Sequence, residues 1–307
     1  MTKRPNFVFI ITDQHRANHL GCYGNPVLRT PHIEGLAARG TRFDRFNVAN
    51  PVCMPNRASL MTGRIPSPHA VRHNGIPLAR DHVTFVELLA AAGYCTGLVG
   101  KSHLQNFTGH GPIVEFETAP GKITPPEALR EANRRALRGP EYDIEKEPLW
   151  LDSSHDVRLP FYGFEEARIC TNHGDLVGAD YRRWLEQKQP GASSLIGTQN
   201  AILDQRRSAP QAWRTSVPEE PYLTSYVKGL SCEFLERQAA AEGDKPFFLQ
   251  VSFSDPHQPF TPPGKYWDMY DPDEIDLPSS FDEGDVAPLL WMRDQLARGA
   301  ADLPDRP

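Results

Sequence analysis

Four polar side chains that could bind an anion or a metal ion follow directly after three apolar runs. The runs cover residues 7–11, 96–99 and 247–253, and the side chains are Asp13, Lys101, His103 and His257. In open α/β sheets, ligands bind outside the carboxyl ends of the strands. A carboxylate, an ammonium group and two imidazoles at such ends predict a site for an anionic group with a divalent metal ion. The alternative is that all three strand ends are ordinary turns and helix caps, because Asp often begins these.

A possible nucleophile lies in the segment 50–64. Cys53 is followed four residues later by Arg57, and the sequence after it is helix-like. The start of a helix offers free backbone N–H groups and a favourable dipole, and Arg57 adds a charge, so this segment could bind an anion beside the thiol. A single Cys is more often a small buried apolar residue. A thiol phosphatase is excluded, because its phosphate loop needs five residues between Cys and Arg, and only three intervene here.

Strands alternate with helices along the chain, which predicts an α/β fold with a largely parallel sheet. The run 7–11 is continuously apolar, the pattern of a strand buried on both faces. Helices are predicted after Thr30, with Ile33, Leu36 and Ala37 on one apolar face, and after Thr84, where Glu87 completes a capping box. A third helix is predicted over 224–237, before the run 247–253.

The region between about residues 105 and 220 is rich in Pro and charged residues and has no clear period. We interpret it as insertions around the core of a single domain, residues 1–307. The tail from Asp271 is acidic and interrupted by Pro, and its last residues contain no element that would complete a sheet.

Composition excludes several classes of protein. The 33 Lys and Arg residues against 39 Asp and Glu give a net charge of −6, so no basic excess is present to neutralise the phosphates of a nucleic acid. No apolar run is long enough for a membrane span or a signal peptide, so we expect a cytoplasmic protein. The five Cys residues form no C-x-x-C pair, which argues against a zinc ribbon or a disulfide framework.

The segment from Cys53 to Arg57, CMPNR, resembles the C-x-P-x-R signature of the sulfatases, a family of the alkaline phosphatase superfamily. Companion segments agree with it: TPHIEGLAARGTRF, SLMTGR, GKSHL and KPFFLQVSFSDPHQPFTPP. The resemblance covers about residues 5–110 and 222–270. It implies an alkaline-phosphatase-like fold, with a mixed, largely parallel sheet flanked by helices, of which this chain would be an N-terminal catalytic portion incomplete at its C-terminus.

The resemblance also implies a chemistry, hydrolysis of a small-molecule sulfate ester. A formylglycine-generating enzyme would oxidise Cys53, and the hydrated aldehyde would attack sulfur. Asp13 and the modified Cys53 would bind a divalent metal ion, most readily calcium, with magnesium or manganese as alternatives. Arg57 would hold the nucleophile. The remaining expected site residues are Lys101, His103 and His257, which would bind the sulfate ester, and Gln14 and Asn74, which would line the substrate pocket.

Two departures from the family pattern leave alternatives open. Asp13 is followed by Gln14 rather than a second Asp, which is more similar to choline sulfatases and phosphonate monoester hydrolases. Phosphate or phosphonate esters therefore remain alternative substrates. No Asp-His or Asp-Asn motif that would supply further metal ligands follows Phe260, and NHGD at residues 172–175 has a different place and order. A truncated, non-catalytic sulfatase-like protein is the third interpretation.

Overall fold

The computed structural model of the chain describes residues 4–109, 120–121, 126, 129, 137–204, 209, 211–241 and 243–276. The last residues of the acidic tail, for which no sheet-completing element was expected, lie outside the described residues. None of the described helices combines the length and the hydropathy that crossing a membrane requires.

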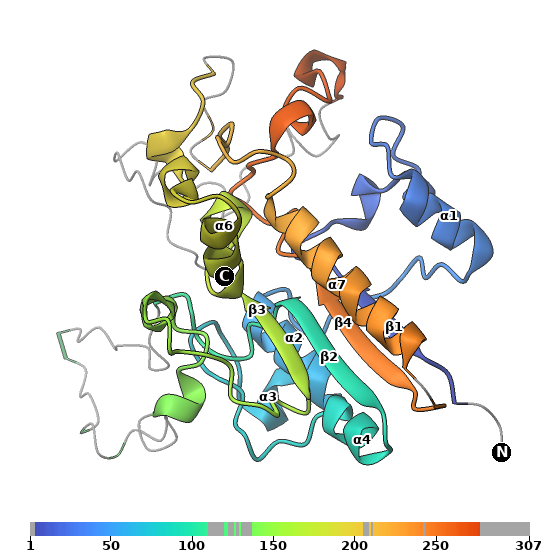
Figure 1. Cartoon of the computed structure of the whole chain (residues 1–307), viewed down its shortest axis with the longest axis vertical. Helices are drawn as coiled ribbons and strands as arrows, with labels where there is room; N and C mark the ends of the chain where they lie inside the picture. The colour runs from blue at the N-terminus through green and yellow to red at the C-terminus, as the bar shows by residue number, and fades with distance from the viewer. Residues whose placement is uncertain are drawn as a thin grey trace.

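The centre of the protein is a parallel sheet of four described strands (Figure 1). The strands are β1 (Phe7–Ile11), β2 (Cys95–Lys101), β3 (Glu166–Cys170) and β4 (Phe247–Ser252). Their spatial order is β1-β4-β2-β3, and every neighbouring pair is parallel. The predicted α/β class with a largely parallel sheet is confirmed. Because all four strands run in one direction, their carboxyl ends meet at one edge of the sheet.

Helices cover both faces of this sheet and give it two apolar cores. The α-helices are α1 (Pro31–Arg39), α2 (Cys53–Thr62), α3 (Pro66–His69), α4 (Phe85–Ala91), α6 (Asp180–Lys188) and α7 (Leu223–Ala240). Successive strand residues alternate between the faces: Phe248 packs in the core that contains residues of α2 and α4, and Leu249 packs in the core of α6 and α7. Figure 1 shows α7 lying along the sheet beside β4.

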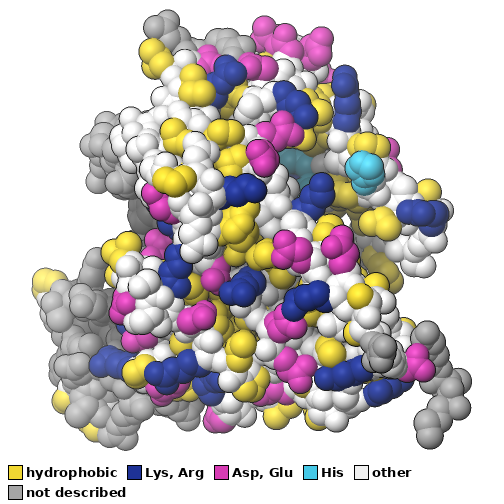
Figure 2. Space-filling model, viewed as in Figure 1, with side chains coloured by type: hydrophobic (Ala, Val, Ile, Leu, Met, Phe, Trp, Pro, Cys, Tyr) yellow, Lys and Arg dark blue, Asp and Glu magenta, His cyan; other side chains and the backbone are white. Residues whose placement is uncertain are grey.

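Short 3₁₀ turns connect these elements. They are η1 (Ala17–His19), η2 (Gly21–Tyr23), η4 (Pro140–Tyr142), η5 (Glu147–Leu151), η6 (Gly174–Leu176), η7 (Ala192–Leu195), η8 (Thr198–Asn200), η9 (Gly264–Tyr266) and η10 (Pro272–Glu274). The face of the molecule in Figure 2 carries acidic and basic side chains intermixed, with hydrophobic side chains between them.

The predicted helix starts have different outcomes. At α4 the capping box is present: the Thr84 hydroxyl accepts a hydrogen bond from the Glu87 N–H at 3.1 Å, and Glu87 accepts one from the Thr84 N–H at 2.7 Å. At α1 the Thr30 side chain does not cap the helix but bonds to Gly21 and Glu34. The apolar face predicted for α1 is also not buried, since Leu36 is 59% exposed.

Two further expectations differ from the structure. The strand 7–11 was predicted to be buried on both faces, but β1 lies at the sheet edge with Phe7, Val8 and Ile10 exposed. Among the described strands its one neighbour is β4. The region 105–220 was interpreted as irregular insertions, but it contains the regular elements β3 and α6.

Candidate active site

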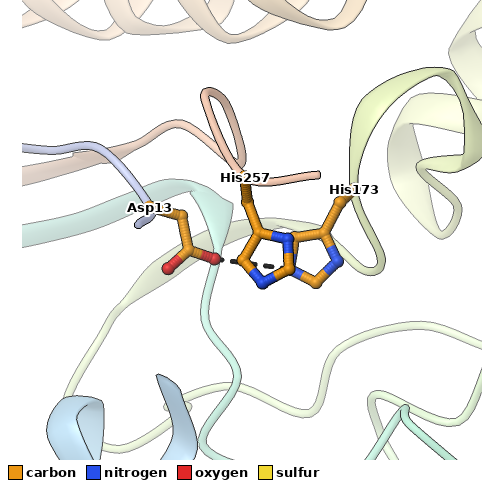
Figure 3. Close-up of side chains that lie close together, drawn as sticks. All are labelled: Asp13, His173 and His257. Carbon is orange, nitrogen blue, oxygen red and sulfur yellow. Dashed lines mark ion pairs between the residues drawn. The ribbon is translucent and has the colours of Figure 1, made fainter. Parts of the chain in front are cut away.

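The ends of four parallel strands bring a carboxylate, an ammonium group and two imidazoles together. Asp13 follows β1, Lys101 ends β2, His173 follows β3 and His257 follows β4. The Lys101 ammonium contacts both the Asp13 carboxylate and Nε2 of His173. Nε2 of His173 lies 3.4 Å from Oδ2 of Asp13, and Figure 3 shows the two rings beside that carboxylate. The sequence predicts three of these four as site residues, and His173 is the one that it does not predict.

Asp13 is a buried carboxylate held in its charged form. Burial alone opposes ionisation, but the charges of Lys101 and Arg57 outweigh it and hold the Asp13 pKa well below its usual value. The guanidinium of Arg57 lies 3.8 Å from the second carboxylate oxygen, Oδ1. The Asp13 backbone N–H donates to the Asp255 carbonyl at 3.3 Å, which links the residues that follow β1 and β4.

His173 and His257 stack as a pair, with ring centroids 3.6 Å apart and planes 10° from parallel. Burial, and then the charge of Lys101, lower the pKa of His173 to about 3, so its imidazole is neutral at ordinary pH. A neutral Nε2 can accept a hydrogen bond from the Lys101 ammonium. On the other ring, Nδ1 of His257 bonds to the Gln258 carbonyl at 2.5 Å, which makes this nitrogen the donor.

Arg57 connects the helix that carries Cys53 to the strand ends. Cys53 is the first residue of α2, as the sequence predicted, and Arg57 lies one turn further along the helix. The Arg57 side chain is buried, and its Nη1 donates to the Lys101 carbonyl at 2.8 Å and to the Ser252 hydroxyl at 3.0 Å. The same guanidinium forms the ion pair with Asp13.

Cys53 is paired with Asn74, one of the two residues predicted to bind substrate. The Asn74 side chain lies 3.5 Å from the Cys53 sulfur through Nδ2, and its carbonyl oxygen accepts the Met54 N–H at 3.2 Å. The side chain of Val52 does not cap α2, and Asn74 instead accepts a hydrogen bond from one of the free backbone N–H groups at the start of this helix. The other predicted substrate residue, Gln14, is exposed beside the buried Asp13, and its role stays a prediction.

His103 lies fully buried, and neither ring nitrogen has a hydrogen-bond partner among the described residues. Its ring stacks on Phe107 at a centroid distance of 3.9 Å. Burial, then the charges of Lys101 and Arg57, hold the pKa of His103 well below its usual value. A buried polar group without a partner is costly, so these nitrogens are suited to bind a group that enters the site.

Gly100 allows β2 and β4 to approach closely just before Lys101. It has a φ of +105°, and a Cβ atom there would lie 1.9 Å from the Ser252 carbonyl oxygen. Only glycine meets both conditions without strain. The residue thereby helps to place Lys101 next to the Arg57 side chain.

His173 could have been identified from the sequence by the same rule that identified the other three. The segment that precedes it ends in the buried residues Ile169 and Cys170, followed by a polar cluster from Asn172 to Asp175. However, β3 is short and two of its first three residues, Glu166 and Arg168, are exposed, so its apolar signal is weak.

Asp13, His173 and His257 also form a possible metal site, since one donor atom of each lies within 4.8 Å of the others. Cys53, which was predicted to be a second metal ligand, is not a member of this group among the described residues.

Comparisons with known proteins identify the family of the chain. A sequence model of the sulfatase family matches residues 5–281. An arylsulfatase of Clostridium perfringens is 27% identical over 280 residues, which cover 90% of this chain and 48% of that protein. Arylsulfatase A of Homo sapiens is 42% identical over 124 residues, 38% of this chain and 23% of that protein.

The fold of the chain is similar to that of solved structures. The phosphonate monoester hydrolase of Agrobacterium radiobacter has a TM-score of 0.59 and 22% sequence identity, over 89% of this chain and 45% of that chain. The chain spans about half the length of the Clostridium relative, 48%. Since the family match extends from residue 5 to residue 281, the chain belongs to the sulfatase family, within the alkaline phosphatase superfamily.

Proposed function

We propose that this chain carries the nucleophile and the anion-binding residues of a sulfate ester hydrolase. The observation that carries the proposal is the position of Arg57, which lies one turn from Cys53 and contacts Asp13, the Lys101 carbonyl and Ser252. It thereby joins the start of the nucleophile helix to the strand ends that carry the charged residues. Membership of the sulfatase family supports the same reaction.

In this proposal the nucleophile derives from Cys53. Its oxidation to formylglycine by a dedicated enzyme would supply a hydrated aldehyde that attacks sulfur. Asn74 would orient residue 53, because its side-chain amide contacts the sulfur and the following N–H. The N-terminus of α2 and the buried guanidinium of Arg57 favour negative charge at this position.

Lys101, His103 and His257 would receive the ester. The Lys101 ammonium binds a sulfate oxygen by charge, and the partnerless nitrogens of His103 can accept or donate a hydrogen bond to the substrate. His257 would give a proton to the departing alcohol, and the neutral ring of His173 would hold it in place by stacking. His173 enters the proposal through its contacts with Lys101 and Asp13.

The family also implies a divalent metal ion, and the described donors fit only part of that expectation. Calcium requires about six to eight oxygen ligands. The described cluster offers one carboxylate and two imidazoles, and its carboxylate already contacts Lys101. Imidazole nitrogens suit zinc, iron or nickel better than calcium. The described residues therefore do not form a calcium site, and no step of the proposed reaction is assigned to a metal ion.

A second candidate function is hydrolysis of phosphonate or phosphate esters at the same residues. The Asp13–Gln14 pair favours it, because the expected second Asp is absent. Sulfate and phosphate esters are both tetrahedral anions, which Lys101 and Arg57 could bind equally.

The test is a comparison of matched aryl substrates. The full chain, produced together with a formylglycine-generating enzyme, is assayed with 4-nitrophenyl sulfate, a 4-nitrophenyl phosphate diester and a 4-nitrophenyl phosphonate, beside Cys53→Ala. The proposal expects the highest kcat/KM for the sulfate and loss of all turnover in Cys53→Ala. A preference for the phosphonate would favour the second function. Absence of turnover with every ester would support a non-catalytic protein.

A further inference from the structure

Glu145 is a buried carboxylate outside the set of residues described above. It belongs to the segment between β2 and β3 and is 0% exposed. Its two oxygens accept hydrogen bonds from three successive backbone N–H groups: Oε2 from His103 at 2.9 Å, and Oε1 from Leu104 at 3.1 Å and Gln105 at 3.2 Å. Burial raises the Glu145 pKa to about 7. The group is therefore retained inside the protein in spite of an electrostatic cost.

The backbone that Glu145 holds belongs to the loop 102–105, which continues directly from Lys101. His103 in this loop has a φ of 53°, a conformation that a non-glycine residue adopts only when its surroundings impose it. Gln105 bonds back to the same segment, since its amide donates to the Glu141 carbonyl at 2.7 Å and accepts from the Ile144 N–H at 2.9 Å. The loop is thus attached to residues 141–145 from two sides.

We propose that Glu145 is a positioning residue that fixes the His103 imidazole and the Lys101 ammonium in the geometry that binds the ester. The inference rests on the proposed function, because it assigns a purpose to the ester-binding roles of these two residues. Glu145 does not touch the substrate and acts through the backbone of the loop. It also gives the segment between β2 and β3, which the sequence suggested to be peripheral, a direct part in building the site.

A carboxyl group suits this arrangement, because both of its oxygens can accept hydrogen bonds. Three N–H donors face two oxygens, and both oxygens must accept. Glutamine has nearly the same shape but offers one accepting oxygen and one donating NH₂ group. In Glu145→Gln, the side-chain NH₂ group must replace one of the two accepting oxygens. Either the His103 N–H or the N–H groups of Leu104 and Gln105 then lose their hydrogen-bond acceptor.

The experiment compares Glu145→Gln with Glu141→Gln, the same change four residues earlier at an exposed side chain. Two quantities are measured on the full chain: kcat/KM for 4-nitrophenyl sulfate, and hydrogen exchange of the amides of residues 103–105. We expect Glu145→Gln to lower kcat/KM by roughly 10- to 100-fold, as loss of an outer partner of a site residue does. Exchange at those three amides should accelerate, and Glu141→Gln should match the wild type in both measurements.

A double-mutant cycle with His103→Ala separates positioning from general loss of stability. If Glu145 acts through His103, Glu145→Gln lowers the residual activity of His103→Ala far less than it lowers wild-type activity. Losses that multiply independently would overturn the proposal, as would a Glu145→Gln variant with wild-type kcat/KM.

Hydrogen exchange of the wild type alone is decisive if Glu145→Gln does not fold. The amides of residues 103–105 must then be strongly protected, and exchange as fast as in exposed loops would overturn the proposal. If the wild type hydrolyses no ester, the proposed function fails, whereas the exchange measurement still decides whether Glu145 holds the loop.

Discussion

The ammonium of Lys101 contacts the carboxylate of Asp13 inside the protein, although the two residues are 88 positions apart in sequence. They meet because β1 and β2 are both paired in parallel with β4, which lies between them. Lys101 is 0% exposed and Asp13 is 7% exposed. A buried pair of this kind contributes little net stability when intact, but leaves an uncompensated charge when one partner is removed.

Lys101→Met should therefore destabilise the protein by about 3 kcal/mol, because among the described residues Asp13 would keep the more distant Arg57 as its one positively charged partner. The matched control is Lys146→Met. Lys146 pairs with Asp143 at 2.8 Å, but its side chain is 49% exposed, so its loss should cost less than about 1 kcal/mol. Urea denaturation measures both. Equal, small losses in the two variants would show that the Lys101–Asp13 pair is not buried as described.

His173→Phe should lower kcat/KM for an aryl sulfate by roughly 10- to 100-fold, the range for loss of a group that orients a site residue. Phenylalanine can retain stacking on His257 but removes the nitrogen that contacts Lys101 and Asp13. His32→Phe, at an exposed position of α1, serves as the control. Steady-state kinetics of the two variants provide the comparison, and wild-type turnover in His173→Phe would remove His173 from the site.

Glu145 should make the stability of the protein depend on pH. Its pKa is raised from 4.5 to about 7 in the folded protein, so the folded state binds a proton that the unfolded state releases. The free energy of unfolding should consequently fall as pH rises from about 4.5 to about 7, by up to about 3 kcal/mol for this group.

Glu145→Gln isolates this contribution, because Asp180 and Asp255, whose pKa values are each raised to about 6, remain in both proteins. Chemical denaturation at a series of pH values should show that the wild type loses stability relative to the variant across this interval. A difference between the two proteins that does not change with pH would contradict the raised pKa.

Two glycines should respond to alanine in opposite directions. Gly100→Ala should be strongly destabilising, since the new Cβ would lie 1.9 Å from the Ser252 carbonyl oxygen at a φ of +105°. Gly229 lies inside α7 with no atom near the position of a Cβ, so Gly229→Ala should stabilise the protein by about 0.5–1 kcal/mol. The melting temperatures of the two variants, compared with that of the wild type, test both expectations. A neutral Gly100→Ala would mean that β2 and β4 are farther apart at this point.

The sequence predicted the parallel sheet and three of the four residues at its carboxyl edge. Asp13, Lys101 and His257 were accessible because each follows an apolar run, and the direction of parallel strands then brings the ends together. Cys53 was correctly placed at a helix start because a helix-like stretch follows it.

Other features were missed, because the local signal is weak or because they depend on contacts distant in sequence. Every residue in the run 7–11 is apolar, so the run looks like a strand buried on both faces. The order of the strands in the sheet is what shows that β1 lies at the edge. His173 follows a strand in which Glu166 and Arg168 are exposed and polar, so the apolar signal before it is weak. The function of Glu145 depends on a loop 40 residues away, and no spacing rule connects the two.

The proposed reaction depends on Cys53 as the precursor of the nucleophile. The most direct test is the mass of the peptide that contains residue 53, from the full chain produced in a host whose formylglycine-generating enzyme modifies a reference sulfatase. Our proposal predicts an aldehyde at residue 53, together with aryl sulfate turnover that rises with the modified fraction and is lost in Cys53→Ala. An unmodified thiol at residue 53, beside a modified reference sulfatase, would contradict it.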